Sequence, residues 1–189
     1  MAVFIIGLLL FFSSHFYSAF RSRAPGDDIK EKLGEERYMG VYSLVSILGF
    51  GLIVWGYSLI EAMPLVFNGL AVSRIVISIL MAAALISLAA AYVPSSNIKR
   101  VVKHPMLLGV GLWGLAHILD GATLKQVLLF GSFLLYSIVD AIAASKRDSA
   151  VGINPPAKLR NDFIAVGVGL LVYMVIAKWL HSFLFGIPI

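Results

Sequence analysis

Cysteine is absent from the 189 residues, and charged side chains are scarce. Without cysteine, thiolate catalysis, disulfide bonds and cysteine-ligated zinc or iron–sulfur centres are excluded, so any metal must be held by His, carboxylate, Tyr or Met. Charged residues make up 13% of the chain, which is about half the share usual in soluble domains. Because 60% of the residues are hydrophobic, the composition excludes both a soluble domain and a disordered chain, and lipid must cover much of the surface.

Long apolar runs are abundant. A membrane-spanning helix needs about 20 apolar residues, and six segments come close: 2–20, 40–60, 74–93, 105–119, 124–144 and 163–181. The fourth is the shortest, because Asp120 and Gly121 end it early, and it spans only where the bilayer thins or neighbouring helices help. No internal repeat is evident. The sequence therefore predicts an all-α, polytopic membrane bundle of about six transmembrane helices that forms one domain over residues 1–189.

The placement of Lys and Arg predicts the topology, because these residues are retained on the cytoplasmic side. Three alternate loops carry twelve of the fifteen, and the opposite side carries Arg74, Lys125 and Lys178. We therefore expect both termini outside and the basic loops in the cytoplasm. The first basic loop also holds five acidic residues, so no nucleic-acid partner is predicted. Its segment 28–37 is either a short amphipathic helix at the membrane surface or a solvated connector.

Ionisable side chains inside a membrane are costly and therefore mark candidate sites. His15 lies in the cytoplasmic half of the first helix, and His117 lies near the outer end of the fourth. His104 stands at the cytoplasmic start of the fourth helix, before Pro105. His181 lies at the outer interface, where the free-energy cost of placing an imidazole is small. Asp140 in the fifth helix either orients an imidazole or pairs with a basic residue one or two turns further on. Ser132 and Tyr136 share its face and are candidate interhelical hydrogen-bond partners.

The spacing of the histidines limits how they combine. His104 and His117 are thirteen residues apart on one helix, or about 20 Å of rise, so they cannot hold one ion. A mononuclear zinc site needs three or four ligands, and no HxxxH or HExxH pattern occurs. A haem needs only one or two axial ligands and room for a flat ring. Gly114 and Gly121 flank His117 and are expected to leave that room, although close helix packing is the alternative for Gly114.

Several blocks resemble the NnrU family of bacterial membrane proteins, which includes the plant 15-cis-zeta-carotene isomerase. They are His15, the run GEERYMGVYS at 34–43, the run KHPMLLGV at 103–110 and the run LWGLAH at 112–117. The resemblance is strongest over residues 1–146. Phe16 and Lys103 depart from the usual Ser and Arg of the family.

The resemblance implies a protein of the bacterial cytoplasmic (inner) membrane that is linked to nitrite and nitric oxide reduction in denitrification. For the isomerase relative it implies haem b with histidine ligands and isomerisation of a double bond in a hydrophobic small molecule. By motif position, His15 and His117 would be the axial ligands, and His104 a catalytic, proton-handling residue. We expect His15 about 9 Å and His117 about 20 Å from the cytoplasmic boundary, so one iron joins both only if the haem tilts strongly. Met106 and Met174 are the alternative second ligands.

Two other functions compete with this one. The run KHPMLLG at 103–109 is similar to part of the S-adenosylmethionine site of membrane methyltransferases of the isoprenylcysteine carboxyl type. Those enzymes complete the site with a later acidic segment, whereas Asp148 is the only acid between residues 146 and 160. Transport is the third candidate function, but the sequence shows neither an inverted repeat nor a pair of broken helices.

Overall fold

The computed structural model describes residues 1–69, 74–151 and 157–186, and this part of the chain is almost entirely helical. The helices are α1 (Ala2–Phe20), α2 (Ile29–Leu33), α3 (Glu35–Ser58), α4 (Arg74–Tyr92), α5 (Asn97–Val102), α6 (Pro105–Leu119), α7 (Leu124–Val151), α8 (Leu159–Val175) and α9 (His181–Phe185), with a π-helical turn at Ile176–Leu180. Two short strands, β1 (Leu65–Phe67) and β2 (Ala122–Thr123), pair antiparallel. The all-α prediction is confirmed.

Within the described residues, five helical stretches are long and apolar enough to cross a membrane, and α6, with 15 residues, is a shorter apolar helix. The molecule is therefore a multi-pass membrane protein. The short α6 packs between α4 and α7 and buries the glycines of its inner face. By contrast, the large apolar side chains of Ile47, Ile75 and Phe163 are 69%, 70% and 70% exposed, as expected for lipid-facing positions.

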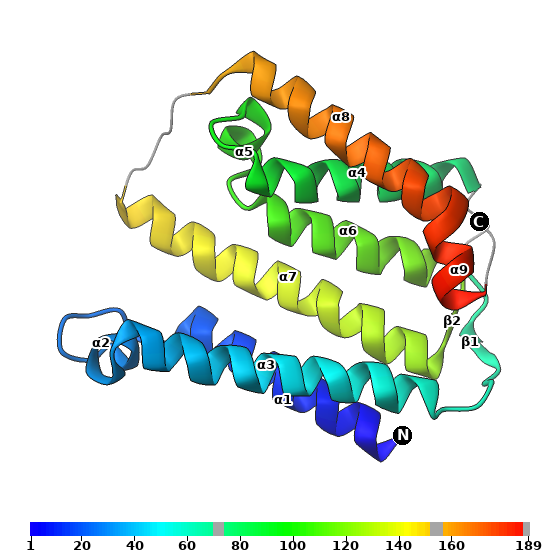
Figure 1. The fold of residues 1–189 in the computed structure, drawn as a ribbon, viewed down its shortest axis with the longest axis horizontal. Helices are drawn as coiled ribbons and strands as arrows, with labels where there is room; N and C mark the ends of the chain where they lie inside the picture. The colour runs from blue at the N-terminus through cyan, green and yellow to red at the C-terminus, as the bar shows by residue number, and fades with distance from the viewer. Residues whose placement is uncertain (70–73, 152–156, 187–189) are drawn as a thin grey trace.

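The helices pack side by side in the order α3, α1, α7, α6, α4, α8. Helix α7 is thus central and joins the α1–α3 pair to the remaining helices (Figure 1). Helices α2 and α5 and the last turns of α7 lie at one end of the bundle, here called the basic end (Figure 1). The N-terminus, the β1–β2 pair and α9 lie at the opposite end. This arrangement brings the three basic loops to one end, as their alternation predicts, and the cytoplasmic placement of that end remains a prediction.

Local signals explain where the short helices begin and end. The Asp28 carboxylate accepts a hydrogen bond from the Lys30 backbone N–H at 2.9 Å and caps α2, and the Ser96 hydroxyl caps α5 in the same way. Gly34, with φ +82°, separates α2 from α3. The predicted surface helix over 28–37 is therefore split, because only its first half forms a separate helix. Its second half begins α3 at Glu35, five residues before the predicted start at Gly40.

Candidate functional site

His15 lies on the side of α1 that meets α3 and α7. Its Nδ1 is 2.7 Å from the backbone carbonyl oxygen of Phe11, one turn earlier. Because a carbonyl can only accept, Nδ1 carries the proton of the neutral ring, and Nε2 keeps its lone pair. The ring stacks on Phe11 with a centroid distance of 4.0 Å and meets the Tyr136 ring edge-on at 5.6 Å. His15 is therefore held in one tautomer and one orientation.

Polar side chains next to His15 connect three helices. Ser14 and Ser46 hydroxyls are 3.2 Å apart and link α1 to α3. On α7, the Tyr136 hydroxyl donates to Asp140 at 3.0 Å. Asp140 also pairs with Arg147 at 3.5 Å, so the basic partner is the one two turns further on. Asp140 bonds to Tyr136 and Arg147, and it is the Tyr136 ring that contacts His15. Asp140 therefore does not orient the His15 imidazole by a direct hydrogen bond.

Ser132 was a candidate interhelical partner, and the structure corrects this expectation. Its hydroxyl donates to the Leu128 backbone carbonyl at 2.6 Å, within α7. A hydroxyl satisfied by its own helix needs no partner across the interface. Tyr136 likewise bonds within α7, and its ring packs against Phe12, His15 and Phe16 of α1.

His117 on α6 repeats the arrangement of His15. Its Nδ1 is 2.8 Å from the Trp113 carbonyl oxygen, and its ring stacks on Phe130 of α7 at 4.3 Å with an interplanar angle of 19°. The space expected beside Gly114 is absent, because a Cβ added there would lie 2.7 Å from the backbone oxygen of Phe130. Close packing of α6 on α7 is therefore the role of this glycine, and the expectation of a free space was wrong.

The two histidines do not touch each other. Among the ring contacts of the described residues none joins His15 to His117, but a row of three rings connects them. Phe11 stacks on His15, Phe133 lies 5.6 Å from Phe11 and 5.5 Å from Trp113, and Trp113 lies 5.2 Å from His117. Their α7 neighbours, Tyr136 and Phe130, are six residues apart, or about 9 Å of helix rise. This offset agrees with the depth difference estimated from the sequence.

The two methionines considered as alternative ligands lie elsewhere. Met106 is 43% and Met174 is 49% exposed, and both are on the outer surface of the bundle. A thioether on the lipid-facing surface is poorly placed to reach a group bound among the aromatic rings of the interior. His15 thus remains the better candidate for a second ligand.

His104 meets an acid that the sequence did not connect with it. Its Nε2 is 3.6 Å from a carboxylate oxygen of Asp148, near the end of α7, and its side chain is 17% exposed. This Nε2 is buried and lacks a hydrogen-bond partner within the described residues. Lys103, with φ +60°, turns the chain from α5 into α6 just before it. His104 and Asp148 are 44 positions apart in the chain, so no sequence spacing predicted that they would meet.

These observations define a polytopic helical membrane protein with two anchored imidazoles in the interior of the bundle and a third beside an acid at its basic end. The family model described as NnrU protein matches residues 3–189, so the chain belongs to the NnrU family. The sequence resemblance was strongest over residues 1–146, and the family match extends well beyond that range. Neither a curated protein nor a solved structure shows significant similarity to the chain.

The Asp140 cluster gives a prediction about stability. Asp140→Asn removes the charge that pairs with Arg147, whose other hydrogen bond goes to the Ala19 carbonyl at 2.8 Å. We expect the variant to lose about 1–2 kcal/mol of stability, because the hydrogen bonds from Tyr136 and from Arg147 both lose their charged acceptor. Tyr136→Phe removes one of these two hydrogen bonds and should cost less. Thermal unfolding in detergent measures both, and an equal or larger loss for Tyr136→Phe would contradict this ranking.

Proposed function

We propose that this protein binds haem b in the bacterial cytoplasmic membrane and acts in nitrogen-oxide or other redox metabolism. In this proposal His117 would be the principal iron ligand and His15 the second. An isomerase-like activity on a hydrophobic small molecule, as the zeta-carotene isomerase relative suggests, belongs to the same proposal. Family membership supports the class of protein, and the arrangement of the two imidazoles is the observation that carries the haem assignment.

The donors suit the cofactor. In metal-binding histidines one ring nitrogen binds the metal and the other donates to a carbonyl or carboxylate. His15 and His117 both have Nδ1 at a carbonyl oxygen of their own helix, at 2.7 and 2.8 Å, which leaves Nε2 as the donor. A bound haem would supply an iron whose redox state and ligation change. Because Phe133 lies in the row of rings between the histidines, this side chain would have to move for a flat cofactor to enter there.

The protein groups around the two histidines have separable tasks. Stacking on Phe11 and Phe130 fixes the planes of the two imidazoles, and the surrounding aromatic rings exclude water. His104 is assigned the role of a proton-handling residue at the basic end, where the Asp148 carboxylate lies 3.6 Å from its Nε2. Since His104 and His117 are at opposite ends of α6, His104 would serve the entry of protons or substrate and would not bind the iron.

An absorption spectrum of the detergent-purified protein, as isolated and after addition of dithionite, tests the proposal. We expect a Soret band and sharp α and β bands on reduction, as two imidazole ligands give a low-spin iron. A protein that is colourless as purified, and stays colourless after haem is added, would refute haem binding. Titration with S-adenosylmethionine should then be carried out, because methyl transfer is the competing function that the sequence suggests.

A further inference from the structure

Positively charged side chains line an open cavity in the surface at the basic end, between the end of α1 and the last turns of α7. The cavity has a volume of about 260 Å³ and is lined by seven residues, of which four are cationic and none is acidic. The cations are Arg21, Arg23, Lys146 and Arg147. Like charges gathered around a cavity repel one another, and an anion inside it relieves that repulsion.

Two of the four cations have no carboxylate partner within the described residues. Arg21 forms an ion pair with Asp28, and Arg147 pairs with Asp140. Arg23 donates only to the Ser18 carbonyl oxygen at 3.2 Å. Lys146 makes no hydrogen bond or ion pair to any residue that the structure describes. The cavity thus carries positive charge beyond what its neighbours neutralise, so it favours a negatively charged group such as a phosphate group.

The pKa of the Arg23 guanidinium reflects the positive charges around it. Burial lowers the pKa of the Arg23 guanidinium, and the positive charges of Arg147 and Arg21 lower it further. In addition, Nε of Arg21 is buried without a hydrogen-bond acceptor within the described residues. The Nε–H of Arg21 therefore lacks an acceptor oxygen among the described residues.

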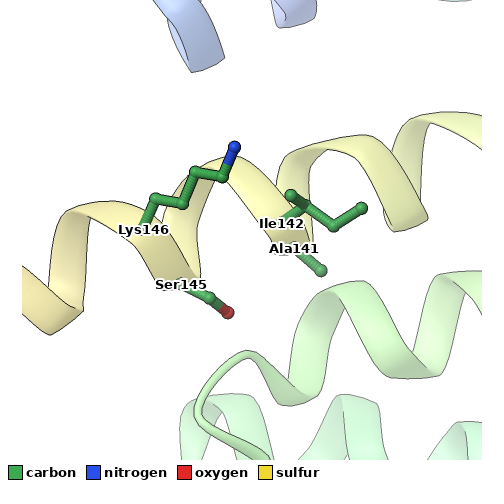
Figure 2. Close-up of a pocket in the computed structure, with 4 residues that line it drawn as sticks. All are labelled: Ala141, Ile142, Ser145 and Lys146. Carbon is green, nitrogen blue, oxygen red and sulfur yellow. The ribbon is translucent and has the colours of Figure 1, made fainter.

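A second, shallow cavity in the surface adjoins the cationic one. It has a volume of about 400 Å³ and is lined by Ala141, Ile142, Ser145 and Lys146, so Lys146 is common to both cavities (Figure 2). In the close-up, the Lys146 ammonium extends to the side of α7 opposite to the Ser145 hydroxyl (Figure 2). Phe20, which lines the cationic cavity, is 61% exposed. A cationic cavity next to an apolar surface at a helix end suits a molecule with a charged head and a hydrocarbon tail.

We propose that Arg21, Arg23, Lys146 and Arg147 form a binding site for a phosphate group, occupied by the headgroup of an anionic phospholipid whose acyl chain lies along Ala141 and Ile142. Basic pockets between helices at the membrane surface bind such headgroups in other membrane proteins. The site is independent of haem, because it lies at the basic end and uses neither His15 nor His117.

Native mass spectrometry of the full-length protein tests the site with two lipids that carry the same acyl chains, phosphatidylglycerol and phosphatidylcholine. We expect selective retention of phosphatidylglycerol by the unmodified protein. The double variant Arg23→Gln/Lys146→Gln should bind it roughly thirty-fold more weakly, since each cation near the surface contributes a factor of about five. The matched control Arg37→Gln/Lys103→Gln removes the same charge at the same end without touching the cavity, and should retain full binding.

The outcomes separate the sources of the phosphate group. If inorganic phosphate at millimolar concentration displaces the lipid, the anion site is supported, and if phosphate binds while neither lipid does, the headgroup assignment is wrong. Equal retention of both lipids, or equal losses in the two double variants, would overturn the site. The single variant Lys146→Gln changes an exposed side chain without an ion pair, so it provides the comparison if the double variant does not fold. Helix content by circular dichroism checks the folding of each protein.

Discussion

His117→Ala is expected to remove nearly all of the haem that the unmodified protein carries. The substitution deletes the principal donor, and the stacked ring of Phe130 has no atom that can replace Nε2. His117→Phe should have the same effect, because it keeps a ring of similar size but no donor, and it thereby separates lost ligation from a cavity in the bundle. Haem content is measured from the Soret absorbance of equal amounts of purified protein.

His104→Ala is the matched control for this prediction. It also removes a partly buried imidazole from α6, but at the other end of the helix, next to Asp148. We expect its haem content to equal that of the unmodified protein. Full haem retention in His117→Ala, or equal losses in the two variants, would contradict the assignment of His117.

Gly56→Val is expected to cause the largest loss of stability, of about 3 kcal/mol, at the upper end of the usual range for overpacking. A Cβ at Gly56 would lie 2.3 Å from the backbone nitrogen of Phe4 and 2.6 Å from its Cα. Because these are backbone atoms, no change of rotamer relieves the clash, and α1 and α3 must separate. Phe4 is fully buried in the apolar cluster of α1, so the separation exposes the core of this helix pair.

Gly51→Val is the control, since Gly51 lies five residues earlier in α3 and has nothing within 4 Å of an added Cβ. Both changes replace glycine by the same β-branched residue inside one helix, so the intrinsic helix propensity cancels. Unfolding midpoints in detergent compare the two variants. Equal midpoints would show that the close approach of α1 and α3 contributes nothing to stability.

The helix positions follow closely from the sequence. The predicted segments 2–20 and 105–119 have the boundaries of α1 and α6, and 74–93 exceeds α4 by one residue. These ends are marked by strong local signals, such as Pro105 at the first helical position and Gly121, with φ +107°, after the last turn of α6. The prediction was wrong at the start of α3 and at the end of α7, because it ended both helices where charged residues begin, whereas the helices continue through them. Helices extend beyond the apolar core of a membrane, so the loss of hydrophobicity does not end them.

The lateral arrangement was not predictable in the same way. Nothing in the apolar runs indicates that α7 lies in the middle, because lipid-facing and helix-facing residues are equally hydrophobic. Gly114 illustrates the problem: the sequence shows a missing side chain, but only the structure shows that the α7 backbone fills the space. The contact between His104 and Asp148 and the pairing of β1 with β2 depend equally on tertiary packing. The imidazoles of His15 and His117 were identifiable because a histidine within an apolar helix is rare.

The central claim is that His15 and His117 together bind one haem per chain. Titration of haemin into the purified apoprotein, followed at the Soret band, tests it most directly when the unmodified protein is compared with His15→Ala/His117→Ala. We expect a sharp endpoint at one haem per chain for the unmodified protein and no saturable endpoint for the double variant. An identical endpoint for both proteins, or the absence of an endpoint for the unmodified protein, would contradict it.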